Sequence, residues 1–463
     1  MLHFLQNTGI SGGVQFIVEL SWLVSAIFLV YVVILLIRFG RRGKAEPGDP
    51  DRFEWHLFVP CRDEEAVIGH TVAYLRANLP GSHVWVIDDD SEDSTAAIVL
   101  AAAETDPLVH LVQRRRPDAR TGKGDALNTA WRRLHDWLPA GVDRDRVIVG
   151  VVDADGRPAP GCLAAVSAEH LFAAAEVGAV QIEVRMVNRS ERTPMPERGR
   201  LANAYGRTLV RMQDIEFRAP MAALQVARRS TRTVCLGGNG QFTRLSALDG
   251  LAEENGVPWN GALLEDYELG IQLLLLGWQN AFCHETYVDQ EGLFDTRRYL
   301  TQRTRWTQGG MQCARYFPQV WRSRHVGRLG VVEVGYHLAQ PWMHLLGTLL
   351  YPIPLLLTAL ECLAAPDQAE QILARSGWLL PAALAAIAIA QFAVWGPLYR
   401  AGAERDAPLG KSLLWGLGYI FYMYGMYVTA WRALFRMMRG QRGWAKTRRN
   451  AEIAVEGPVA VEA

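Results

Sequence analysis

Apolar positions along the chain form long uninterrupted runs near both ends and short runs between polar segments in the middle. Residues 20–37, LSWLVSAIFLVYVVILLI, contain no charged side chain and approach the length of about 20 apolar residues that a helix needs to cross a bilayer. Three further apolar blocks follow at about 331–364, 377–398 and 412–434. Residues 46–295 have the mixed composition of a globular domain, so the sequence predicts one such domain between membrane segments.

The first apolar run is predicted to remain in the mature chain as a transmembrane helix. Its basic residues, Arg38, Arg41, Arg42 and Lys44, follow the run, whereas a signal peptide carries them before it. Because basic residues favour the cytoplasmic side, residues 1–45 are expected to leave the N-terminus outside and the next domain in the cytoplasm. The expected location is the plasma (inner) membrane, crossed several times.

The C-terminal region, residues 331–434, leaves the number of crossings open. Its first block is interrupted by Pro341, Pro352 and Pro354. The basic tail, residues 435–463, should return to the cytoplasm and end in a disordered segment, which requires an even number of crossings after the globular domain. Three blocks give an odd number. Either the first block divides into two crossings, which we favour, or one block lies along the membrane interface.

Short apolar runs alternate with helical segments in the globular part. Strands are expected at His56–Pro60, His83–Asp90, Leu108–Gln113 and Arg146–Asp155, with helices at Glu64–Asn78, Ser94–Glu104 and Asp125–Leu138. Repeating strand–helix units predict an α/β fold with a mostly parallel sheet covered by helices on both faces. Ligands of such sheets bind beyond the carboxyl ends of the strands. Acidic residues gather at those ends: Asp88, Asp89 and Asp90 after one strand, Asp153 and Asp155 after another.

Composition narrows the function classes. The 463 residues carry a formal net charge of zero, and no basic domain with interleaved aromatic residues is present, which argues against a nucleic-acid partner. The six cysteines are widely scattered, so a disulfide framework or a zinc site is not indicated, and a reducing compartment is expected. There is no P-loop and no GxGxxG motif after a strand, so a nucleotide would be held by acids and a metal. This favours a nucleotide-sugar, whose diphosphate leaving group needs charge neutralisation.

Asp153 and Asp155 are the candidate metal ligands. They lie in DADGRPAPG, and the next helix is expected only near Pro160, so helix capping does not account for them, as it does for Ser91 and Asp93. Two carboxylates one residue apart in a loop can share a hard divalent cation. Mg²⁺ or Mn²⁺ is therefore the expected cofactor.

Motifs in a fixed order resemble the family 2 membrane glycosyltransferases, the group that contains cellulose, chitin and hyaluronan synthases. The segments are VPCRDEE at 59–65, VIDDDSEDST at 86–95, GKGDALN at 122–128, DAD at 153–155, GGNGQFTR at 237–244, LLEDYELG at 263–270 and QRTRW at 302–306. Asp90 stands where the family usually has glycine, a departure that affects the loop shape more than the chemistry. The resemblance covers nearly the whole chain and implies a GT-A-like domain flanked by transmembrane helices.

The resemblance also implies a role for each site residue. Nucleotide-sugar binding falls to Glu65, Asp88, Asp89, Lys123 and Asp153, and the metal to Asp155 with Asp153. Asp266 is the implied general base, which takes the proton of the attacking hydroxyl, with Glu265 in support. Acceptor and diphosphate contacts fall to Gly238, Asn239, Gln302, Arg305 and Trp306, the last three in a predicted interfacial region, residues 296–330.

Several of these residues also have purely structural explanations. Lys123 could be a solvated lysine at a helix start, and Asp266 an acid in a first helical turn, where the helix dipole favours it; the motif order favours function for Asp266. The run Arg114–Arg116 is interpreted as a solvated charge cluster. Arg303 is interpreted as an anchor at the membrane interface. Residues 201–218 are expected to be helical and mainly to pack in the core.

Three functions remain open. The first is a processive synthase that moves sugars from UDP-sugar to a growing polysaccharide with inversion, exports the β-linked product and works with accessory export proteins. The alternative is transfer of one sugar to a membrane lipid, as in ceramide- or diacylglycerol-glucosyltransferases. The third, a catalytically inactive scaffold or a transporter module, is disfavoured by the intact acids. The expected partners are therefore a UDP-sugar donor, a polysaccharide or lipid acceptor, and the bilayer.

Overall fold

The computed structural model describes residues 12–350 and 389–441, together with single positions at 356, 360, 363, 364, 367, 370, 443 and 450. The expected span at 377–398 therefore lies largely outside the described residues. The expected disordered end and two of the prolines in the first C-terminal block also lie outside them.

An eight-stranded mixed sheet forms the centre of the globular body, in the order β3-β2-β1-β4-β7-β6-β8-β5. Six strands run in one direction, while β7 and β5 are antiparallel to their neighbours. The strands are β1 (Glu54–Cys61), β2 (Ser82–Asp89), β3 (Val109–Arg114), β4 (Val147–Val151), β5 (Arg157–Pro158), β6 (Val177–Met186), β7 (Gln241–Arg244) and β8 (Gln279–Gln290). The expected mostly parallel sheet is thus a mixed one, interrupted beside β4 by the short strand β7.

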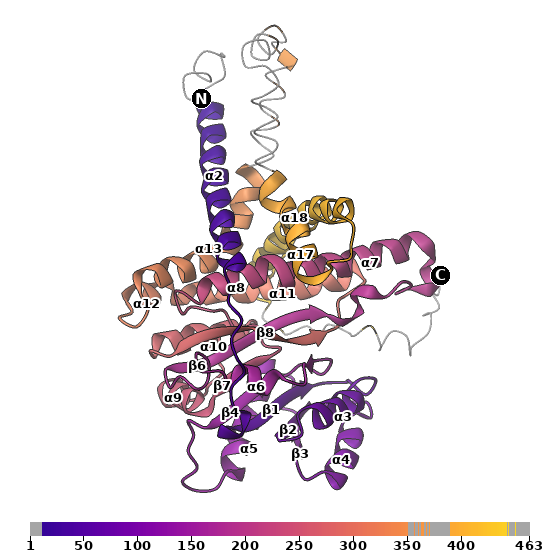
Figure 1. Cartoon of the computed structure of the whole chain (residues 1–463), viewed down its shortest axis with the longest axis vertical. Coiled ribbons are helices and arrows are strands. Elements are labelled where there is room, and N and C mark those ends of the chain that lie inside the picture. Colours follow the sequence, from indigo (N-terminus) through magenta and orange to yellow (C-terminus); the bar gives the residue numbers. More distant parts are fainter. Residues whose placement is uncertain are drawn as a thin grey trace.

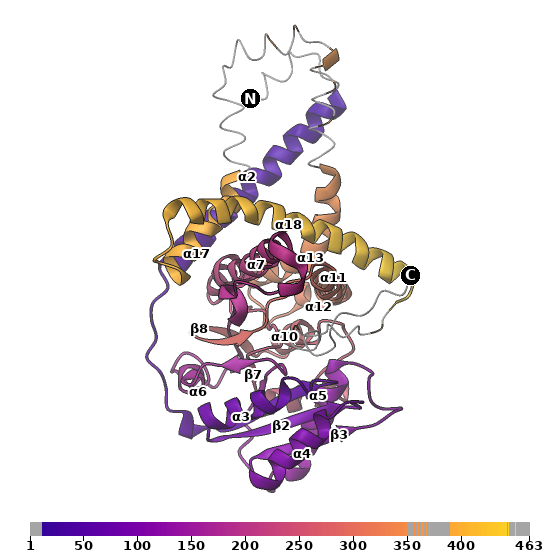
Figure 2. The same cartoon turned by 90° about the vertical axis from the view of Figure 1, so that its right-hand side faces the viewer.

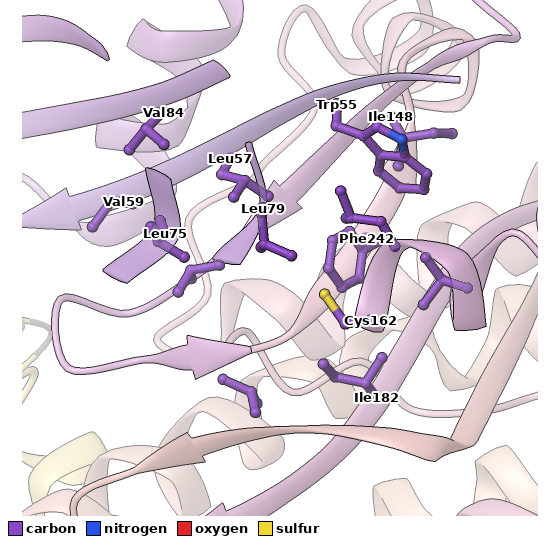
Figure 3. Packing of buried hydrophobic residues seen from close by; sticks show 14 of the residues in the cluster. Trp55, Leu57, Val59, Leu75, Leu79, Val84, Ile148, Cys162, Ile182 and Phe242 are labelled. Atoms are coloured by element: carbon purple, nitrogen blue, oxygen red, sulfur yellow. The ribbon is translucent and has the colours of Figure 1, made fainter. Parts of the chain in front are cut away.

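Helices cover both faces of the sheet, as the alternating pattern predicts. On β1, Trp55, Leu57 and Val59 point to one face, whereas Phe58 points to the other. Figure 3 shows the apolar core on the face of Trp55, Leu57 and Val59, where Phe242 lies near Cys162. The helices of this face are α3 (Ile68–Asn78), α4 (Thr95–Thr105) and α6 (Cys162–Val166), and those of the opposite face are α5 (Lys123–Trp137), α9 (Leu245–Asn255) and α10 (Glu265–Leu275).

A layer of helices lies between the sheet and the helix α2 (Gly12–Gly40), which rises away from the body (Figure 1). Its members are α7 (Gly199–Glu216), the π-helical turn Phe217–Met221, α8 (Ala222–Arg228), α11 (Thr296–Cys313), α12 (Phe317–Arg322), α13 (Arg328–Leu350), α17 (Trp395–Ala403) and α18 (Leu409–Met438). Figure 2 shows α18 running across the top of the body while α11 is viewed nearly end-on. Side chains of α2, α7, α8, α17 and α18 share one apolar cluster.

Among the described residues, one helix is long and apolar enough to cross a membrane. It spans Glu19–Gly40, 22 residues with a mean hydropathy of 2.8, and matches the first expected run, although an N-terminal signal sequence can meet the same criterion. The multi-pass arrangement is not supported by the described part of the chain. Within it, α13 continues through Pro341 to Leu350, so the expected division of the first C-terminal block does not occur at this proline.

Candidate active site

Four segments meet where the central strands end. Asp153 and Asp155 follow β4, and Gly237–Gly240 precedes β7. Because β7 pairs antiparallel with β4, the start of β7 lies beside the end of β4. The N-termini of α5 and α10 bring Lys123 and Asp266 to the same edge. The segments that form this edge are far apart in the sequence, and the fold brings them together.

Lys123 is the centre of a compact charge cluster. Its Nζ lies 2.7 Å from Asp153 Oδ1 and 3.6 Å from Glu265 Oε1. Burial alone would lower the pKa of Lys123, but the carboxylates of Asp153, Glu265 and Asp266 together raise it. The ammonium is therefore charged at neutral pH, and the solvated helix-start interpretation of Lys123 is wrong.

Asp266 is buried in the first turn of α10, with 8% of its surface exposed. Its Oδ1 accepts a hydrogen bond from its neighbour's amide, Tyr267 N, at 2.6 Å. Burial and the adjacent Glu265 carboxylate raise the pKa of Asp266 to about 7, while Lys123 opposes the shift. A carboxyl group that titrates near neutrality can accept a proton in a reaction at that pH.

The loop Gly237–Gly240 closes over this acid. Asn239 accepts a hydrogen bond from Asp153 N through Oδ1 at 3.2 Å and donates one to Gln290 Oε1 at 2.9 Å. Gln181 on β6 holds the loop from below: its amide donates to Asn239 O at 2.9 Å and accepts from Gly237 N at 2.8 Å. Sequence reasoning missed Gln181 and Gln290. Gln181 could have been noticed as a lone amide in the apolar segment VGAVQIEV.

Gly238→Ala is expected to lower turnover strongly, by about 10²-fold if the carboxylate is displaced by an ångström. Gly238 has φ +72°, and an added Cβ would lie 2.8 Å from Asp266 Oδ2 and 3.2 Å from Lys123 Nζ. Gly256→Ala is the matched control, because Gly256 has φ +82° but open space around a Cβ. The steady-state turnover rates of both variants distinguish contact with Asp266 from backbone strain. Equal loss in the two variants would mean that backbone strain, and not contact with Asp266, is responsible.

Asp155 lies two residues beyond Asp153 and is 8% exposed. Its Oδ2 accepts a hydrogen bond from Glu291 N at 3.0 Å, which fixes the carboxylate at the β8 side of the site. No group of three or more metal-ligating side chains occurs within the described ranges. Asp153 and Asp155 would offer two carboxylates, a set that suits a hard cation able to take its remaining oxygens from water and a phosphate group.

Arginines surround the acids that end β2, in contrast to the expected solvated cluster. Arg114 is buried and pairs with Asp89, whose Oδ1 also accepts a hydrogen bond from Arg120 N at 3.0 Å. Arg115 Nη1 lies 3.2 Å from Asp88 Oδ2. The interpretation of Arg114 as a solvated charge is thus wrong, because β3 pairs with β2 and directs these guanidinium groups onto the acids.

The loops around Asp88 and Asp89 are held by local capping. Glu65 is exposed, and its Oε2 accepts a hydrogen bond from Ser94 N at 2.9 Å at the start of α4. Asp90 has φ +62°, in the left-handed region that glycine adopts without strain and that aspartate tolerates. The departure from glycine at position 90 therefore leaves the loop shape intact.

Gln302, Arg305 and Trp306 lie on α11, on the side that faces α10. At about 100° per residue, the three positions fall within about 60° of Gly309. A Cβ on Gly309 would lie 2.5 Å from Leu264 Cβ, two residues before Asp266. This face of α11 therefore lies toward the start of α10. The Trp306 ring packs edge-to-face against Phe217 of the π-helical turn, with ring centroids 6.4 Å apart.

Arg303 points into the helix layer, with its guanidinium over the Trp306 ring, and is not an interfacial anchor. It is 4% exposed and forms a bidentate ion pair with Glu216 of α7, at 2.9 and 2.6 Å. Tyr422 of α18 donates a hydrogen bond to the same carboxylate at 2.5 Å. One buried ion pair thus joins three helices of the layer and holds α11 in place.

Arg303→Met is expected to lower the free energy of unfolding by about 3–5 kcal/mol, because it leaves the Glu216 charge buried without its partner. The exposed pair Arg116–Glu92 supplies the control, and Arg116→Met should cost less than about 1 kcal/mol. Denaturant unfolding of the purified chain in detergent measures both. The combined variant Arg303→Met/Glu216→Leu should recover part of the lost stability. A small loss of unfolding free energy in Arg303→Met alone would contradict the structural role of the ion pair.

Comparison with known proteins identifies the fold and the family. A solved mannosyltransferase from Pyrobaculum calidifontis, in complex with GDP-Man and Mn²⁺, is 19% identical with a TM-score of 0.56, covering 92% of this chain and 99% of that chain. This likeness shows that the globular body has the GT-A-like α/β fold of that enzyme.

Curated relatives include β-monoglucosyldiacylglycerol synthases. That of Synechocystis sp. is 33% identical over 271 residues, 58% of this chain and 49% of the relative. That of Trichormus variabilis is 32% identical over 261 residues, 55% of this chain and 48% of the relative. The matches span about half the length of these relatives. The model of the family described as glycosyltransferase like family 2 matches residues 53–309, more than half of the chain. The chain therefore belongs to glycosyltransferase-like family 2.

Proposed function

We propose that the chain transfers one hexose from a UDP-sugar to the hydroxyl of a membrane lipid of the diacylglycerol class, with inversion. The observation that carries the proposal is the cluster of Lys123, Asp153 and the raised-pKa Asp266 at one edge of the sheet, together with the similarity to β-monoglucosyldiacylglycerol synthases. Those relatives support the lipid alternative better than the polysaccharide synthase that the sequence analysis placed first.

The chain's own residues would perform the steps as follows. Asp266 in its carboxylate form takes the proton of the acceptor hydroxyl as that oxygen attacks the anomeric carbon. The bond between that carbon and the diphosphate oxygen breaks, and Lys123 stabilises the negative charge that gathers on the leaving group. A single displacement inverts the anomeric centre, so an α-linked donor gives a β-linked lipid.

A divalent cation fits the acidic loop after β4. Asp155 and Asp153 would hold it, and when bound it would neutralise charge on the diphosphate. Asp88, Asp89 and Glu65 are proposed to contact the nucleoside, either directly or by shaping the loop. Gly238, Asn239, Gln302, Arg305 and Trp306 are proposed to line the acceptor side, with α2 anchoring the chain in the membrane and the catalytic domain in the cytoplasm.

UDP release by the purified full chain, across a panel of UDP-sugars, tests the proposal. Each donor is offered with vesicles that contain diacylglycerol, with vesicles that lack it, and with a soluble oligosaccharide. Release is expected to require diacylglycerol and to be greatest with one UDP-hexose. Release that depends on the oligosaccharide, and not on the lipid, would favour polysaccharide synthesis instead.

A further inference from the structure

Helix α18 carries an apolar stripe that no described residue covers. Its 30 residues extend about 45 Å at 1.5 Å per residue. Large apolar side chains recur at intervals of three, four or seven along this length and stay exposed, Phe421 by 77% and Met438 by 74%. The stripe consists of Leu409, Leu413, Leu417, Phe421, Tyr424, Val428, Phe435 and Met438.

The opposite side of α18 is fixed to the catalytic body along most of its length. Near its start, the backbones of α17 and α18 touch, since a Cβ on Gly396 of α17 would lie 2.2 Å from Ser412 O of α18. In the middle, Tyr422 bonds to Glu216. Toward the end, Thr429 accepts a hydrogen bond from Thr307 at 3.2 Å, and Arg436 donates one to Gln308 Oε1 at 2.9 Å.

These attachments are incompatible with a crossing. If α18 spanned the bilayer, α11 and the Arg303–Glu216 ion pair would lie beside its middle in the hydrocarbon. Charged side chains at that depth are costly, and α11 and α7 are part of the body that carries the candidate active site. A helix attached along one side and apolar along the other is instead typical of a segment that lies in the membrane interface.

The charges of α18 indicate what kind of surface covers the apolar stripe. The helix contains no acidic residue, and the exposed basic residues Lys411 and Arg432, with Arg439 directly after the helix, lie toward its two ends. Basic side chains around an apolar face favour an anionic lipid surface. The attached side of α18 also packs with the apolar α2, because Val32 and Leu35 of α2 belong to the cluster that contains Tyr419 and Tyr422 of α18.

We propose that α18 lies in the plane of the bilayer, with its apolar stripe inserted at the boundary between headgroups and acyl chains. Figure 2 shows the helix in the corresponding position, across the top of the body and not alongside α2 as it rises. The third C-terminal apolar block is then an interfacial helix, one of the two solutions left open by the sequence. α18 would hold the α11 face with Trp306 at the level of lipid headgroups.

Depth measurements on the full chain in vesicles of phosphatidylglycerol and phosphatidylcholine test this. Nitroxide labels are placed singly by Leu413→Cys, Phe421→Cys, Val428→Cys and Phe435→Cys, and Glu92→Cys is the water-exposed control. Cys61, Cys162, Cys283 and Cys313 are buried, and labelled protein without an added cysteine gives the background. Collision rates with oxygen and with a soluble nickel chelate then report the depth of each label.

The four α18 labels are expected at one shallow depth, within about one helical turn of 5.4 Å of each other, while Glu92→Cys remains in water. Label depths that run in order along α18 from one membrane surface through the centre would show a crossing and overturn the proposal. Full nickel access at all four sites, or loss of both nickel and oxygen access through contact with a second copy, would overturn it equally. UDP release, measured on the same samples, reports on the proposed reaction separately.

Discussion

Asp266→Asn is expected to reduce sugar transfer by about 10²–10⁴-fold, the usual contribution of a general base, and to leave donor binding largely unchanged. The substitution keeps the size of the side chain and removes its ability to accept the hydroxyl proton. UDP release measures the first effect, and calorimetric titration with the donor measures the second. Asp125→Asn is the matched control, since Asp125 is an exposed acid in the first turn of α5.

The pH profile of the unmodified chain sharpens this prediction. Because Asp266 must be deprotonated to accept a proton and its pKa is about 7, kcat/KM should rise with pH and level off above neutrality. Glu265 contributes to that raised pKa, so Glu265→Gln should move the rising limb to lower pH. Near-normal transfer by Asp266→Asn, or a limb that Glu265→Gln leaves in place, would show that Asp266 is not the base.

Asp155→Ala is expected to remove both metal binding and metal-stimulated turnover. Asp155 and Asp153 supply the two carboxylates of the loop after β4, and losing one leaves a single ligand for a cation that prefers several oxygens. Mn²⁺ binding to the protein, followed by electron paramagnetic resonance in the absence of donor, gives a reading independent of activity. Asp136→Ala removes an exposed carboxylate of α5 and should bind Mn²⁺ normally. Unchanged Mn²⁺ affinity in Asp155→Ala would refute the ligand assignment.

Sequence patterns located β1–β4 and α3–α5 to within a few residues, because each strand is a short apolar run and each helix lies between two such runs. The β6, β7 and β8 strands were not predicted. β7 has only four residues, too few for periodicity to be visible, and β8 alternates buried with partly buried positions. The antiparallel β7, which brings Gly238 beside Asp153, therefore required the three-dimensional structure.

For the site, motifs in the sequence predicted some residues correctly, whereas residues with partners distant in the sequence were misjudged. Lys123, Asp153 and Asp266 were singled out by motif order, and the structure brings them together. The misjudged residues, Arg114 and Arg303, both have partners far along the chain, in Asp89 and Glu216. Nothing in the sequence near either arginine indicates such a partner. Helical spacing alone, however, would have placed Arg303 about 120° from Gly309, on the side of α11 turned away from Leu264.

Mass spectrometry of the lipid product tests the central claim most directly. The purified full chain is incubated with its preferred UDP-hexose and vesicles that contain diacylglycerol, and the extracted lipids are analysed for added sugars and anomeric configuration. The proposed function predicts diacylglycerol carrying one β-linked hexose. A long glycan chain, an α-linkage, or sugar transfer that proceeds equally without diacylglycerol would contradict it.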